Sequence, residues 1–173
     1  MAPLRTTILV QPPSETTPSQ PWSPSPVLRV DFTLPYLDRT CIKAKAVLVG
    51  WHGHEIVGGL KGTATADPHF GLPKGRPGIY APTEWNAYFC WEGLAVVDEG
   101  SYKLRFEVEV PGVGREVVQS RSVLVWRHGG ILERMGRPSA DEFRTLERLT
   151  KEVGRGPFRT VKYEASGGPT TWF

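Results

Sequence analysis

The side chains best suited to metal chemistry are the two histidines of His52-Gly53-His54, with His69, Cys41 and Cys90 as further candidate ligands. Zinc sites take their cysteine or histidine ligands in closely spaced pairs, whereas these two cysteines stand alone in apolar, strand-like segments. Lone cysteines in such surroundings are typical of buried thiols. We therefore expect two buried thiols, an exposed turn centred on Gly53 and no metal site, with a zinc site as the alternative.

Catalytic chemistry finds little support in the sequence. No glycine-rich phosphate loop follows a predicted strand, no Gly-x-Ser-x-Gly elbow is present, and the four histidines are scattered. Carboxylate pairs such as Asp98-Glu99, or Glu107 with Glu109, stand in a turn or on the charged side of a strand. A general acid or base needs an environment that tunes its pKa, and no such environment is indicated. We expect no enzyme and no cofactor.

Contact with nucleic acid is suggested by two short cationic motifs. Pro73-Lys74-Gly75-Arg76-Pro77 resembles the core of an AT-hook, and Met135-Gly136-Arg137-Pro138 repeats its Gly-Arg-Pro portion. A flat Gly-Arg-Pro backbone lets cationic side chains enter a narrow minor groove. The alternative is an ordinary Gly/Pro turn in which an arginine occurs by chance.

Positive charge is concentrated toward the C-terminus of the 173-residue chain, which has a net charge of +3. Residues 1–120 hold 11 basic and 12 acidic side chains, and residues 121–173 hold 10 and 6. Since phosphate contacts supply much of the affinity for nucleic acid, the basic final third fits a polyanionic partner, with a solvated surface as the alternative. Lys43 and Lys45 have two interpretations: they prevent a strand at the sheet edge from pairing with another chain, or they contact phosphate.

Strict alternation of apolar and charged residues over 102–110 predicts a half-buried antiparallel strand. The aromatic segment 88–91 predicts a buried strand, which we expect to pair with the first through a connection longer than a two-residue hairpin. Further strands are predicted over 6–10, 27–34 and 41–51.

Residues 115–126 are also predicted as a strand, in which the parity of the apolar positions changes, so that we expect a bulge or burial on both faces. A helix is predicted over 139–153, because Ser139 and Glu142 form a capping box and Phe143, Leu146, Leu149 and Val153 share one face. Gly154 is placed to end it. The remaining segments are predicted to be irregular: a Pro-rich loop over 11–26, a long loop over 63–82 and a frayed tail over 167–173.

Many short strands, Pro/Gly turns and one late helix predict an all-β, immunoglobulin-like sandwich with one C-terminal α-helix, formed as a single domain over residues 1–173. No apolar stretch is long enough to span a membrane, and no signal-peptide core is present. Asn86, the only asparagine, stands outside a glycosylation sequon. We expect a protein that acts inside the cell without a membrane partner.

A longer pattern joins several of these segments. Tyr88-Phe89-Cys90-Trp91 leads through Leu94-Ala95-Val96 to Glu99-Gly100-Ser101-Tyr102-Lys103-Leu104-Arg105-Phe106. This order resembles the signature of the fungal velvet-domain regulators, and weaker matches follow the family's order at 8–12, 26–30, 57–60, 120–126 and 139–154. The resemblance implies a Rel-like sandwich that forms homodimers or heterodimers, binds double-stranded DNA in the nucleus after shuttling from the cytoplasm, and regulates fungal development, sporulation and secondary metabolism.

The same resemblance places Arg127 and His128 where the family has a lysine-containing loop. The expected DNA contacts are Arg127, His128, Arg134 and Arg137, with Lys74 and Arg76 as a minor-groove arm and Arg159 and Lys162 as phosphate anchors. Related domains carry a basic loop where residues 14–25 contain Glu15 and no basic residue. This departure supports an alternative, in which the chain is a velvet-type interaction module that dimerises but binds DNA weakly alone.

Overall fold

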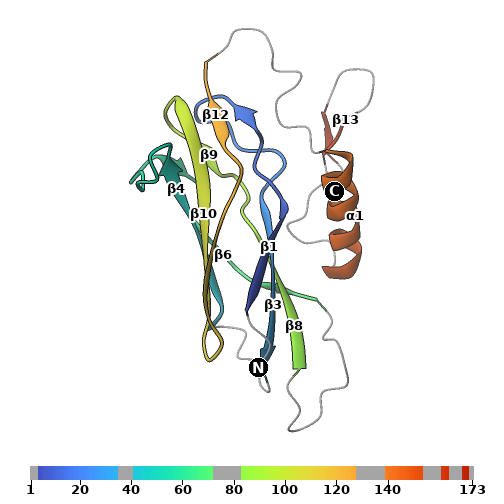
Figure 1. Cartoon of the computed structure of the whole chain (residues 1–173). Helices are drawn as coiled ribbons and strands as arrows, with labels where there is room; N and C mark the ends of the chain where they lie inside the picture. Colours follow the sequence, from blue (N-terminus) through green and yellow to red (C-terminus); the bar gives the residue numbers. More distant parts are fainter. Residues whose placement is uncertain are drawn as a thin grey trace.

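Alternation along β10 (Gly100–Val110) sorts its side chains onto two faces, with Leu104, Phe106, Val108 and Val110 buried in the core. The computed structural model describes residues 4–34, 41–71, 83–127, 139–153, 161–163 and 169–171. In these residues two sheets face each other, and one helix lies outside them (Figure 1). The predicted all-β sandwich with one C-terminal helix is confirmed.

The first sheet, called sheet A, has the strand order β1-β3-β8-β7. β3 (Val27–Leu34) lies between β1 (Arg5–Val10) and β8 (Thr83–Cys90), antiparallel to both, and β7 (His69–Phe70) follows β8. The predicted strands over 6–10 and 27–34 are therefore confirmed. The aromatic strand starts earlier than predicted, at Thr83.

The second sheet, called sheet B, has the order β2-β12-β10-β4-β6, and β11 (Gly114–Gln119) also pairs with β10. β4 (Lys43–Gly50) lies between β10 and β6 (Thr65–Ala66). β2 (Glu15–Thr16) runs parallel to β12 (Val123–Val125). The strand predicted over 41–51 is thus present, in a slightly shorter form.

Aromatic side chains from the two sheets meet in the core. The ring centroids of Trp91, which follows β8, and Phe106 of β10 are 4.7 Å apart. The expected pairing of the aromatic strand with the 102–110 strand is therefore wrong, because β8 pairs with β3 in sheet A and β10 pairs with β4 in sheet B. The connection between them crosses from one sheet to the other, and on the way β9 (Ala95–Val96) pairs with β5 (Leu60–Lys61).

The parity change over 115–126 is a β-bulge. Both β11 and β12 pair with β10, and between the Arg105–Gln119 pair and the Tyr102–Val123 pair the chain gains one residue relative to β10. Ser120 is buried at this position, where its Oγ accepts a hydrogen bond from Leu104 N at 2.9 Å. The single predicted strand is consequently divided into two.

The Pro-rich segment 11–26 is held by backbone hydrogen bonds to β12 and to the chain next to β9. Trp22 N donates to Leu94 O at 2.8 Å, and Leu124 N donates to Ser14 O at 2.8 Å. The Trp22 side chain is only 4% exposed and belongs to the core between the sheets. Although this segment is mostly irregular, as predicted, it is a fixed part of the sandwich and also contributes β2.

The helix α1 (Ala140–Val153) covers the outer face of sheet A (Figure 1). Ser139 N donates to Glu142 Oε2 at 2.9 Å and Glu142 N donates to Ser139 Oγ at 3.2 Å, which is the predicted capping box. Leu146 and Leu149 are buried with Val10, Val27 and Tyr88. The predicted helix is confirmed, while Gly154 lies outside the described residues.

Three predictions need correction. The sequence predicts two buried thiols, but Cys41, which precedes β4, is exposed, and Cys90 is partly buried against the cluster under α1. Residues 63–71 of the predicted long loop contain β6 and β7. Within the predicted tail, β14 (Pro169–Thr171) pairs with β13 (Val161–Tyr163).

In the described chain, no helix combines the length and hydropathy needed to cross a membrane.

Candidate nucleic-acid interface

Arg127 leaves the end of β12 at one end of the sandwich. Its side chain is 82% exposed, and its Nε lies 3.4 Å from Glu99 Oε1, just before the start of β10. An ion pair this exposed is weak in water. Arg127 is therefore available to a negatively charged partner, since little stability would be lost by breaking the pair.

The other predicted DNA contacts are not brought together with Arg127 by the described residues. His128, Arg134, Arg137, Lys74, Arg76 and Arg159 all lie outside them. The backbone of Lys162 lies in β13, where it pairs with Thr170 of β14. Their roles stay predictions.

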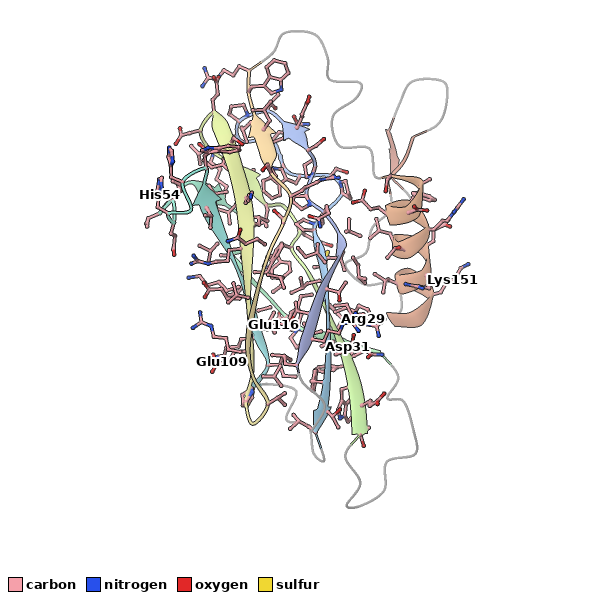
Figure 2. All side chains as sticks on the ribbon, viewed as in Figure 1. Arg29, Asp31, His54, Glu109, Glu116 and Lys151 are labelled. Carbon is pink, nitrogen blue, oxygen red and sulfur yellow. The ribbon has the colours of Figure 1, made fainter. Side chains whose placement is uncertain are left out.

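Lys43 and Lys45 project from the outer face of sheet B, as the alternation predicts. Each stands directly opposite a glutamate of β10: Lys43 opposite Glu109 and Lys45 opposite Glu107. Figure 2 shows Glu109 on this side of the sheet. Cross-strand pairs of opposite charge stabilise a sheet, so this face is of mixed charge and is a poor surface for a polyanion.

The solvent side of α1 carries three exposed basic residues, Arg144, Arg148 and Lys151, together with the exposed acidic residues Asp141 and Glu147. Lys151 points away from both sheets (Figure 2). Arg144 Nη1 lies 3.5 Å from Asp141 Oδ1, and the Arg144 side chain is 79% exposed. The exposed side of α1 is therefore of mixed charge, and it lies on a different face of the molecule from Arg127.

The turn after β4 exposes two apolar side chains that the sequence analysis does not single out. Trp51 is 74% exposed and Val57 is 90% exposed. The turn is held by hydrogen bonds, because Gly50 N donates to His54 O at 2.9 Å and Ile56 N donates to Leu48 O at 2.9 Å. In the sequence, the exposure of Trp51 is indicated only by its position next to the Gly-centred turn 52–54, which has no apolar residue to cover it.

The predicted exposed turn at His52-Gly53-His54 is confirmed. Gly53 has φ +83° and donates its N–H to Gly50 O at 2.9 Å. The His52 and His54 rings are stacked with centroids 6.4 Å apart. Within the described ranges, no three or more His, Cys, Asp or Glu side chains are grouped so as to hold a metal ion.

Searches against protein-family models and against curated proteins find no match to this chain. The likeness to the velvet family therefore rests on the motifs between Tyr88 and Phe106 and on the order of the weaker matches.

Proposed function

We propose that the chain is a velvet-type nuclear regulator, which binds double-stranded DNA as a dimer through the sandwich end that carries Arg127. The observation that supports this proposal best is the exposure of Arg127, whose only recorded ion pair in the described chain is a 3.4 Å contact with Glu99. An arginine in this state can exchange a weak partner for a phosphate or a base edge.

The chain that follows Arg127 adds to this argument. His128, Arg134 and Arg137 come within ten residues of it in the sequence. A cationic segment that starts from a fixed strand end is a common way to place several cations along one nucleic-acid backbone.

A second function is favoured by other observations. The segment 11–26 contains no basic residue and is fixed to β9 and β12, and the lysines of β4 face glutamates. An exposed tryptophan on a hydrogen-bonded turn is the kind of side chain that dominates protein interfaces. The second candidate is therefore a velvet-type interaction module, which dimerises with a partner and binds DNA weakly alone.

The experiment is fluorescence anisotropy of a labelled promoter duplex across a salt series, with the mass of the protein in solution recorded alongside. We expect Arg127→Ala to weaken binding several-fold and to reduce the salt slope by about one unit, because one phosphate contact is lost. Arg144→Ala is the matched control, since Arg144 is equally exposed and also pairs weakly with one carboxylate.

Equal effects of the two substitutions would remove Arg127 from the interface. Absence of DNA binding by a folded dimer would favour the interaction module instead. A monomeric protein that binds DNA would contradict the dimer.

A further inference from the structure

A pocket of about 300 Å³, lined by both apolar and charged residues, opens on the face of sheet A that also carries α1. Its lining comes from β1, β3 and β8, and consists of Arg5, Asp31, Phe32, Thr33, Glu84, Trp85 and Asn86. Figure 2 shows Asp31, with its neighbour Arg29, on this side of the molecule. A pocket of this size fits the lower end of the range for small-molecule sites.

The floor of the pocket is already neutralised. Asp31 Oδ1 accepts a hydrogen bond from Arg29 Nε at 2.8 Å. With the amide of Asn86 oriented to satisfy its neighbours, the Asn86 nitrogen donates to the same oxygen and to Trp85 O at 3.3 Å. Asp31 therefore holds the floor together and has little charge left for a ligand.

The two walls carry opposite charges. Arg5 of β1 stands directly opposite Asp31, which in turn stands opposite Asn86 of β8. Glu84 lies two residues before Asn86 and therefore points to the same face of the sheet. No ion pair is recorded for Arg5 or for Glu84 in the part of the chain that the structure describes, and both are exposed.

From this arrangement we propose that the pocket binds a small zwitterion, with the carboxylate of the ligand on Arg5 and its ammonium group on Glu84. Neither a simple anion nor a simple cation satisfies both walls, because each would leave one wall unpaired and be repelled by it. The Cα atoms of Arg5 and Glu84 are about 12 Å apart, since they are separated by two strand spacings across the sheet and by two residues along it. Side chains of this length reach inward from both walls, so the ligand charges are expected to be a few bonds apart.

The site does not depend on the proposed DNA function. Arg5 begins β1, whereas Arg127 follows the opposite end of the sandwich at β12 (Figure 1). The chemistry identifies an amino acid or a related amino carboxylate, and the length between its two charges is the property to test.

The test is isothermal titration of the full chain with glycine, 4-aminobutyrate and 6-aminohexanoate, and with butylamine and butyrate as probes of single charge. We expect saturable binding with an optimum within the amino acid series, at least about tenfold tighter than either singly charged probe, since each wall adds a charge-assisted hydrogen bond. Arg5→Ala and Glu84→Gln should each weaken the best ligand about tenfold. Arg144→Ala, which removes another exposed arginine outside the pocket, should leave binding unchanged.

Three results would overturn the proposal: no saturable binding by any amino acid, equal binding of a singly charged probe, or binding that survives both wall substitutions. The ligand series is measured on the unaltered protein, so a variant that fails to fold does not prevent a decision.

Discussion

The backbone N–H of Gln11 donates to Glu142 Oε1 at 3.1 Å, and this bond joins the end of β1 to the first turn of α1. The other oxygen of the same carboxylate accepts from Ser139 N at 2.9 Å. Gln11 continues the link, because its Oε1 accepts from Arg121 N at 3.0 Å beside the bulge. One carboxylate thus caps the helix and also fixes it to sheet A, and Gln11 connects both to sheet B.

Removal of this carboxylate should loosen the helix. We expect Glu142→Ala to lower the free energy of unfolding by about 1–2 kcal/mol, because the backbone amides of Ser139 and Gln11 both lose their acceptor. Urea denaturation measures the change.

The matched control is Glu147→Ala, which removes an exposed glutamate from the same helix. We expect it to change stability by no more than about 0.5 kcal/mol. A loss as large as that of Glu142→Ala would show that the stability change comes from helix charge alone.

Close approach of two chain segments requires a glycine at position 62. Gly62 has φ +94°, and a Cβ there would lie 2.8 Å from Gly93 O, whereas Gly53 has φ +83° with no atom within 4 Å. Both Gly→Ala substitutions introduce backbone strain of about 1 kcal/mol. We expect Gly62→Ala to lower the free energy of unfolding by about 1–3 kcal/mol more than Gly53→Ala, because the backbone oxygen of Gly93 must move. Urea denaturation of both variants measures the difference. Equal losses would mean that this contact is not close in solution.

The two cysteines should differ in reactivity. Burial, and secondarily the negative charge of Glu92, raises the pKa of the Cys90 thiol from 9.0 to about 12, whereas Cys41 is exposed. At pH 8 only about one Cys90 in ten thousand would be the reactive thiolate. We expect iodoacetamide to label Cys41 in the folded protein and to label Cys90 only in urea, as measured by mass spectrometry. Equal labelling rates without urea would contradict the burial of Cys90.

The same shift makes stability depend on alkaline pH. Because the folded state favours the neutral Cys90 thiol, its contribution is full below pH 9.0, the ordinary pKa, and is lost as pH rises toward about 12. In that window the free energy of unfolding falls by about 1.4 kcal/mol per pH unit because of this group. We expect Cys90→Ala to lack this part of the slope when urea denaturation is repeated between pH 8 and pH 11. An unchanged slope would assign the alkaline loss to other groups.

Local patterns explain why much of the fold is predictable. The parity of β10, the parity change at Ser120 and the capping box at Ser139 each depend on residues within a few positions. The pairing partner of β8 cannot be predicted from nearby residues, because an aromatic strand can pair with any strand that shields it from water. Trp91 and Phe106 meet across the sandwich rather than within one sheet, and only the path of the connecting chain decides between these arrangements.

The candidate sites show the same limit. The exposure of Arg127 follows from its place after a strand, which the sequence indicates. The proposed zwitterion pocket could not be predicted, since Arg5 and Glu84 are distant in the sequence and are placed on the same face of sheet A only by the register of β1, β3 and β8. Six of the expected DNA contacts fall outside the described residues.

Glu107 is the centre of the charged cluster on sheet B. Burial opposes its ionisation, but hydrogen bonds and charges from Arg115 and Arg105 outweigh it and lower the pKa of Glu107 below 4.5. A lowered pKa stabilises the fold above the unfolded value, and this contribution is lost as pH falls through the folded pKa. We expect Glu107→Gln to cost about 0.5–1 kcal/mol at pH 7, since Arg115 is largely exposed, and almost nothing near pH 2. The control is Glu109→Gln, on the same strand and face, whose effect on the free energy of unfolding should change less between the two pH values. An equal change would assign the effect to the general charge of the sheet rather than to the Arg115–Glu107–Arg105 contacts.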